Sequence, residues 1–256
     1  MGARLPVIVA MCLAFSSPLQ ARELSLRYDG YYLVFRVISI DAVSSVEPAA
    51  YRTNVTMRTT GLLNAFGRWQ STATATGAVD GALLRPAFYG ASSEFRDRRQ
   101  RVALEYDRSG SVRADVEGML TDGERDDVPV LLRDGTVDPL TATVTLPRRI
   151  VTTGTCAGII RVFDGLRRYN LRYEDLGSVE LEPSSRDDYQ GTARYCRATV
   201  EPLAGFVRSG EGAGEAATEM SVWLAPPVPG SPPVAVRIDL TSARGTLHLH
   251  LARVGG

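Results

Sequence analysis

The chain contains no lysine, and all 29 of its basic residues are arginine. It holds only two histidines, His248 and His250, both near the carboxyl terminus. Histidine is the side chain most often used for acid-base catalysis, so this scarcity leaves little material for such chemistry. The sequence also lacks a nucleophile elbow, a phosphate-binding glycine loop and a histidine-glutamate metalloprotease signature. We therefore expect a non-catalytic protein without a cofactor.

Charge of one sign is not in excess, and long apolar runs are missing beyond the amino terminus. The 29 basic residues are matched by 29 acidic residues, and removal of Arg4 with a leader leaves a net charge of about −1. Such a balance gives no bulk attraction to nucleic acid. No second apolar stretch approaches the length of a membrane-spanning helix, so the mature chain is predicted to have no transmembrane span.

Residues 1–21 have the layout of a secretory signal peptide. Arg4 stands in a basic start, an apolar run extends from Leu5 to Phe15, and small residues lead to Ala21. The run is about half as long as a membrane-spanning helix, so we expect cleavage after Ala21. Residues 22–256 then form a single all-β domain. Export without any eukaryotic signature predicts the periplasm of a Gram-negative bacterium, where a disulfide persists.

Apolar and polar residues alternate over many short stretches, which is typical of half-buried strands. In the clearest stretch Leu247, Leu249 and Leu251 alternate with His248 and His250. The sequence predicts ten to twelve such strands with short turns and two short helices. The expected fold class is mainly β: a single antiparallel curved sheet forming an open or closed β-barrel, with a sandwich as the alternative.

Three segments are interpreted in more detail. The apolar run 31–40 predicts that the extended chain continues through it. Residues 121–135 carry acidic groups, glycine and proline without periodicity, which indicates an exposed loop. Asp138 followed by Pro139 predicts a helix amino terminus, with a short helix ending near Leu146.

Cys156 and Cys196 are the only cysteines outside the amino-terminal segment. An even pair in an exported chain predicts a disulfide. It would close a span of 40 residues, counted from 156 to 196, for which the chain-entropy estimate is about 4 kcal/mol of stabilisation. The alternative is two reactive or metal-binding thiols, which lack the further ligands and the close spacing of such sites.

The histidine pair offers another metal site. His248 and His250 share one strand face and could present two imidazoles, with Asp239 of the neighbouring strand as a third ligand. No third histidine exists, so the simpler interpretation places both on the solvent face of their strand.

Two arginine clusters are candidate contacts for a ligand or a partner. An anionic headgroup or a carboxylate can be bound bidentately by arginine. The simpler interpretation is that these arginines lie on wet strand faces and turns beside acidic neighbours. The candidate residues are Arg98, Arg101, Arg167 and Arg168.

Several short motifs, in their order and spacing, resemble the exported proteobacterial proteins that carry the domain of unknown function 3108. The resemblance covers about residues 24–253 and implies a largely β periplasmic protein without known catalytic residues. It also implies a cysteine before the Phe-Asp-Gly turn and another in a later strand. The motifs are Tyr28, Thr60-Gly61-Leu62-Leu63 with Phe66, Leu83-Leu84-Arg85-Pro86, Asp138-Pro139-Leu140-Thr141-Ala142, and Val162-Phe163-Asp164-Gly165 with Arg168-Tyr169.

Two functional hypotheses follow. In the first, the curved sheet holds an apolar or amphiphilic molecule such as a lipid between its strands. In the second, the chain is a structural or interaction module of the cell envelope with a protein partner, using residues 121–135 and the proline-rich segment 226–233 as contact points. An unrecognised hydrolase is the third and weakest alternative.

Overall fold

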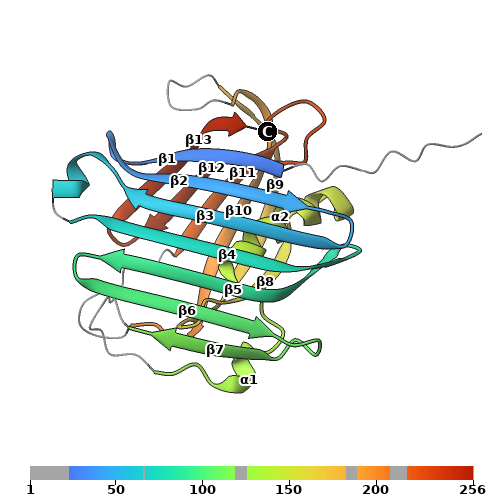
Figure 1. Ribbon diagram of the computed structural model, residues 1–256. Coiled ribbons are helices and arrows are strands. Elements are labelled where there is room, and N and C mark those ends of the chain that lie inside the picture. The colour runs from blue at the N-terminus through green and yellow to red at the C-terminus, as the bar shows by residue number, and fades with distance from the viewer. Residues whose placement is uncertain (1–22, 66, 119–125, 183–188, 208–217, 256) are drawn as a thin grey trace, which may run out of the picture.

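The computed structural model describes residues 23–65, 67–118, 126–182, 189–207 and 218–255, so the expected signal peptide lies outside the described residues. Within them the chain forms thirteen strands, two α-helices and one 3-10 helix (Figure 1). The first seven strands are β1 (Glu23–Tyr32), β2 (Phe35–Val46), β3 (Ala50–Thr59), β4 (Trp69–Asp80), β5 (Leu83–Phe95), β6 (Arg98–Tyr106) and β7 (Val112–Glu117). The other six are β8 (Gly158–Phe163), β9 (Arg168–Leu181), β10 (Gly191–Ala204), β11 (Glu219–Ala225), β12 (Val234–Ser242) and β13 (Gly245–Gly255). The helices are η1 (Gly61–Ala65), α1 (Val130–Arg133) and α2 (Pro139–Thr153).

All thirteen strands belong to one antiparallel sheet, in the order β7-β6-β5-β4-β3-β2-β1-β13-β12-β11-β10-β9-β8. Each half is a succession of hairpins, and the halves meet where β1 pairs with β13. The sheet curls so that its two halves face each other (Figure 1). Among the described strands no ladder joins the edge strands β7 and β8. The predicted curved antiparallel sheet is therefore confirmed, in its open form.

Two details of the strand prediction differ from the structure. The run 31–40 is not one extended segment, because the chain reverses at Leu33 and Val34 between β1 and β2. The sequence contains no glycine, proline or asparagine there to mark the turn. In addition, β8 and β11 were not predicted, which accounts for thirteen strands in place of ten to twelve.

Helix α2 begins as the sequence predicts. Asp138 is the N-cap, and its side chain accepts a hydrogen bond from the Thr141 backbone N–H at 2.8 Å. The helix is longer than predicted and runs through Pro147 to Thr153. Threonines in it satisfy their hydroxyls on carbonyls of the preceding turn, as Thr145 does on Thr141 at 2.8 Å. The expected loop 121–135 also contains the short helix α1, while residues 119–125 lie outside the described part.

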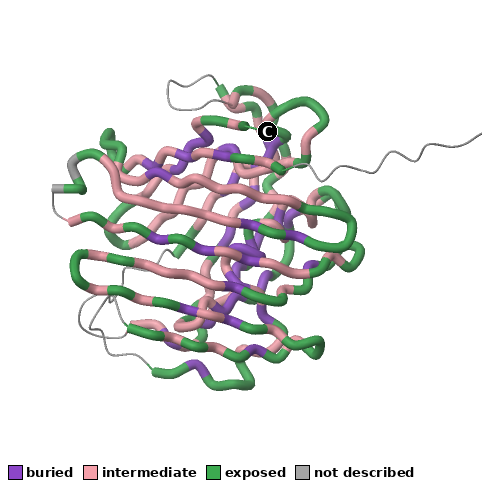
Figure 2. The backbone as a smooth tube through the Cα atoms, in the orientation of Figure 1, coloured by how far each residue is buried: buried purple, intermediate pink, exposed green. Residues whose placement is uncertain are grey.

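The core lies between the two halves of the sheet, with α2 inside the curl. Figure 2 shows buried positions gathered toward the middle of the molecule and exposed positions along the hairpin turns. Leu140 of α2 belongs to a cluster formed mainly by β3 to β7, whereas Leu146 belongs to a cluster with β8 to β11. The helix therefore joins the two halves by burying apolar surface against both.

The turn between β8 and β9 brings the two halves into contact. Phe163 is fully buried and packs in the cluster of β3 to β7. Gly165 adopts φ +94°, and a Cβ atom there would lie 2.4 Å from Cγ1 of Val102 in β6. A glycine is thus required both by the backbone conformation and by the close approach to β6. The Phe-Asp-Gly turn is therefore a point of close contact between the two halves of the sheet.

Candidate functional site

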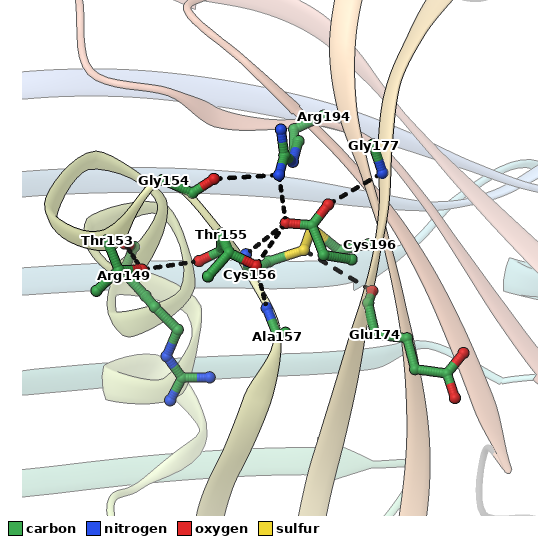
Figure 3. The surroundings of a disulfide bond; sticks show 11 residues. Arg149, Thr153, Gly154, Thr155, Cys156, Ala157, Glu174, Gly177, Arg194 and Cys196 are labelled. Carbon is green, nitrogen blue, oxygen red and sulfur yellow. Dashed lines mark hydrogen bonds and ion pairs between the residues drawn. A yellow bond between two sulfur atoms is a disulfide. The ribbon is translucent and has the colours of Figure 1, made fainter.

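The predicted disulfide between Cys156 and Cys196 is present (Figure 3). The sulfurs are 2.06 Å apart, the Cα atoms are 6.2 Å apart, and both residues are fully buried. The bond ties the segment before β8 to β10, across the intervening β9. Both sulfurs are consumed by the bond, so the alternative of two free thiols does not describe this structure.

Asp175 of β9 organises the backbone next to the disulfide. Its Oδ2 accepts hydrogen bonds from the backbone N–H of Cys156 at 3.0 Å, the hydroxyl of Thr155 at 2.7 Å and the guanidinium of Arg194 at 2.6 Å. Burial by itself raises the pKa of Asp175, but these hydrogen bonds outweigh it and hold the pKa well below its usual range. Asp175 therefore serves as a permanent anion that positions Cys156.

The four candidate arginines do not form one site. Arg98 and Arg101 are three residues apart in β6, so they lie on opposite faces of the sheet. Arg167 pairs with Asp164 in the β8–β9 turn at 2.7 Å, and this ion pair raises the pKa of the guanidinium. The arginines of β6, the Arg167–Asp164 pair in the turn and Arg168 therefore lie in separate environments.

Arg168 fits neither interpretation of the arginine clusters, neither ligand binding nor a solvent-exposed position. It is only 7% exposed, so it is neither on a wet face nor open to a headgroup. Its guanidinium donates to the backbone carbonyl of Leu132 at 2.9 Å, to that of Tyr169, and to the side-chain oxygen of Asn170 at 3.0 Å. Burial lowers the pKa of Arg168. Its role is to attach α1 to the start of β9.

The histidine pair is also placed differently from the prediction. His250 is 4% exposed rather than on a solvent face, and its ring stands edge-on to that of Tyr31 at 5.7 Å. His248 is half-buried, with Nδ1 2.9 Å from Oδ1 of Asp239, the predicted neighbour. Within the described ranges, no group of three or more histidine, cysteine, aspartate or glutamate side chains is placed to hold a metal ion.

The interior holds a polar group that the sequence analysis identified only as a helix cap. Asp138 is fully buried, and burial raises its pKa to about 6, although hydrogen bonds from Thr141 act in the opposite direction. The Thr141 hydroxyl donates to Asp138 Oδ2 at 2.5 Å and lies 2.7 Å from the Tyr51 hydroxyl, which therefore donates to it. These hydrogen bonds form a relay from Tyr51 of β3 through Thr141 of α2 to Asp138, and all three residues are buried.

A hollow of about 380 Å³ lies on the face of β4 to β7 that is turned away from α2. Gly90 and Ala103 are cross-strand partners and leave its floor without large side chains. The Phe88 ring covers part of Gly90, at 2.9 Å from where a Cβ would stand. The polar side chains around the hollow are Thr72, Thr74, Ser92, Arg101, Asp115 and Glu117.

Arg101 is thus the only one of the four candidate arginines that lines this hollow. Its guanidinium is 3.6 Å from a carboxylate oxygen of Glu117, and both side chains are more than half exposed. Sequence patterns predicted the arginine but not the hollow, because the hollow depends on which residues β4 to β7 place side by side. The lining carries one cationic and two anionic side chains, with hydroxyls and an aromatic ring.

Comparison with known proteins gives a family but no activity. The model of the family described as "Protein of unknown function (DUF3108)" matches residues 27–251. No curated protein matches the chain. Among solved structures, it is similar to the β-barrel-like protein of domain of unknown function DUF1849 from Brucella abortus, at 10% identity over 91% of this chain and 96% of that chain, with a TM-score of 0.49. None of the helices in the described ranges has the length and apolar character needed to cross a membrane.

Proposed function

We propose a function for this chain from its geometry. The chain belongs to the DUF3108 family, whose members are described as proteins of unknown function. The chain is a non-catalytic periplasmic protein that holds a small amphiphilic molecule of the lipid class. The ligand lies in the hollow over Gly90 and Ala103, and the observation that carries this proposal is the presence there of both Arg101 and the Phe88 ring.

The size and lining of the hollow support a small ligand with two kinds of surface. Its volume of about 380 Å³ falls in the range of about 300–1,000 Å³ that is common for ligand sites. Phe88 is 40% exposed and offers an aromatic face to an apolar group. Arg101 binds an anionic oxygen, and Asp115 and Glu117 bind a cationic group such as an ammonium. This combination fits a zwitterionic head such as phosphoethanolamine.

The ligand site differs from the one expected from sequence alone. That hypothesis placed an apolar or amphiphilic molecule between the strands, inside the curl. Leu140, Ala142 and Leu146 of α2 are buried there against both halves of the sheet. The opposite face carries the hollow and is open to solvent, so ligand exchange there requires no opening of the core.

The absence of catalysis is part of the proposal and is supported by the use of the titratable groups. Asp138 is sealed in the core and both of its oxygens accept hydrogen bonds from Thr141. His248 is paired with Asp239, on a part of the sheet that does not line the hollow. A hydrolase would need a base and a nucleophile that both face one solvent-accessible point.

Titration calorimetry with dihexanoyl phosphatidylethanolamine tests the proposal on the chain from residue 22 onward. We expect binding that Arg101→Gln weakens about tenfold or more, since a charge-assisted hydrogen bond is worth roughly 1.5–3 kcal/mol. Ala103→Phe fills the floor and abolishes binding. The control is Arg99→Gln, which removes an arginine of the same strand face that pairs with Glu94 outside the hollow. No binding to the unmodified chain, or equal loss in the control, rejects the site.

A second candidate function, an interaction module of the envelope, is favoured by helix α1. Val130 and Leu131 are 62% and 87% exposed, within the segment 121–135 that the sequence suggested as a contact. In-cell crosslinking should recover a partner that Leu131→Asp loses and Val151→Asp keeps, since Val151 is 65% exposed on α2. Recovery of the same proteins from both variants counts against this candidate.

A further inference from the structure

The hairpin between β1 and β2 ends in four consecutive exposed apolar side chains. They are Tyr32, Leu33, Val34 and Phe35, at 39%, 69%, 69% and 51% exposure, and we call them the apolar tip. They include the whole two-residue turn and the strand residue on each side of it. Figure 2 shows the turn as an exposed margin of the sheet. Such a cluster marks a surface that meets another apolar phase.

The composition of the apolar tip is not explained by the needs of the turn. Leu33 adopts φ +55°, a left-handed conformation that glycine or asparagine takes far more easily than leucine. The next residue, Val34, is a β-branched residue that favours extended strand rather than a turn. The hairpin would form more readily with small polar residues at both positions. The apolar residues therefore serve something other than folding.

The apolar tip is held in place rather than loosely attached. The Tyr32 hydroxyl donates a hydrogen bond to the backbone carbonyl of Arg244, in the adjacent β12–β13 turn. The ring of Tyr32 also lies against Gly245. At the base of the tip, Arg36 is half exposed and pairs at 3.1 Å with Asp29, which is only 14% exposed. The apolar tip thus arrives at any partner already ordered.

Two exposed arginines stand beside the apolar tip, one at its base and one in the adjacent β12–β13 turn. Arg36 and Arg244 are both exposed, whereas Asp29, the ion-pair partner of Arg36, is only 14% exposed. Aliphatic and aromatic side chains beside two exposed arginines match the layers of an anionic bilayer. There, aromatic rings lie at the level of the headgroups and arginine contacts phosphate. A protein partner usually offers a flat or concave patch, and a two-residue turn presents little area to it.

From these observations we propose that the apolar tip inserts into the interface of an anionic lipid bilayer and docks the protein on the membrane surface. Leu33 and Val34 enter the acyl boundary, Tyr32 and Phe35 lie at headgroup level, and Arg36 and Arg244 contact lipid phosphates. The inference goes beyond the proposed function, because none of these residues lines the hollow.

The test is flotation of the chain from residue 22 onward with vesicles of phosphatidylethanolamine and phosphatidylglycerol. The key variant combines Leu33→Gly with Val34→Ser. It relieves the left-handed leucine, so its melting temperature should equal or exceed that of the parent, while the bound fraction should fall at least tenfold. The control is Leu83→Ser, which removes a leucine of similar exposure, 63%, at the opposite end of the sheet. Arg101→Gln should bind vesicles normally, which separates this inference from the ligand proposal.

Insertion is checked independently by the variant Val34→Trp, whose fluorescence should be quenched by brominated lipids and shifted to the blue. The proposal is overturned if the parent fails to float with anionic vesicles at low salt, or if the tip variant floats as well as the parent. It is also overturned if the tip variant loses a crosslinked envelope protein while neither chain binds vesicles. That outcome would assign the apolar tip to a protein.

Discussion

Replacement of Gly165 by alanine tests how much the close contact between the β8–β9 turn and β6 contributes to the stability of the protein. Two costs add. An L-residue at the φ of +94° loses about 1–2 kcal/mol relative to glycine. The new Cβ would also stand 2.4 Å from Val102 Cγ1, more than 1 Å inside the ordinary contact of about 3.5–4.0 Å. Overpacking of this kind costs roughly 1–3 kcal/mol.

We therefore expect Gly165→Ala to lower the free energy of unfolding by about 2–5 kcal/mol. Gly154→Ala is the matched control. Its φ is +76°, and no atom lies within 4 Å of the added Cβ, so only the backbone cost of about 1–2 kcal/mol applies. Urea unfolding followed by tryptophan fluorescence, with the disulfide intact, measures both variants on the same scale.

The double variant Gly165→Ala with Val102→Ala isolates the contact. Removing the valine methyl groups gives the new Cβ its space, so the two substitutions together should cost less than the sum of the two alone, by about 1–3 kcal/mol. The reasoning is wrong if Gly165→Ala is no more harmful than Gly154→Ala, or if the double variant is strictly additive.

Three further predictions concern the core and the disulfide. Burial raises the pKa of Asp138 from 3.8 to about 6, so the folded state binds the Asp138 proton more tightly than the unfolded chain does. The contribution of the protonated Asp138 to the free energy of unfolding is full below pH 4. It is lost as pH rises to about 6, and it amounts to on the order of 3 kcal/mol. Asp138→Asn, which keeps an acceptor for Thr141, should flatten that part of the stability profile in urea titrations from pH 4 to 7, and an unchanged slope would contradict the assignment. Tyr51→Phe removes the hydroxyl that donates to Thr141 and should cost about 1 kcal/mol in the same assay, whereas a neutral result would mean that the relay adds nothing. Replacing Cys156 and Cys196 together by serine should cost about 4 kcal/mol, seen as a lower urea midpoint that dithiothreitol no longer changes.

Much of the sheet was predictable because alternation encodes a half-buried strand directly. Leu249 and Leu251 of β13 are buried as their spacing indicates. Strand β11 carries the same alternation in Met220, Val222 and Leu224, although no strand is predicted there from the sequence. The turn at Leu33 carried no such signal, because its residues favour extended chain and only the pairing of β1 with β2 forces the reversal.

The sites were predictable in residue type but not in environment. His250 stands at a position that alternation assigns to solvent, yet the ring of Tyr31 covers it. Arg168 is covered by the carbonyl of Leu132 at the end of α1, across 36 residues of sequence. Both coverings come from segments distant in the chain, so a local pattern could not reveal them. The hollow beside Arg101 likewise depends on the register of four strands.

The ladder between β1 and β13 sets the order in which the protein can be completed. Strands β1 to β7 and β8 to β13 each pair with their neighbours in sequence, so each half can assemble as successive hairpins emerge. Ser25 meets Gly255 only after the final strand has formed. Until then β1 offers an open edge to any other unfinished chain. The 11 residues of β13 complete the sheet. A chain truncated within them is expected to keep the two halves linked only through the core around α2, with open strand edges that are prone to aggregation.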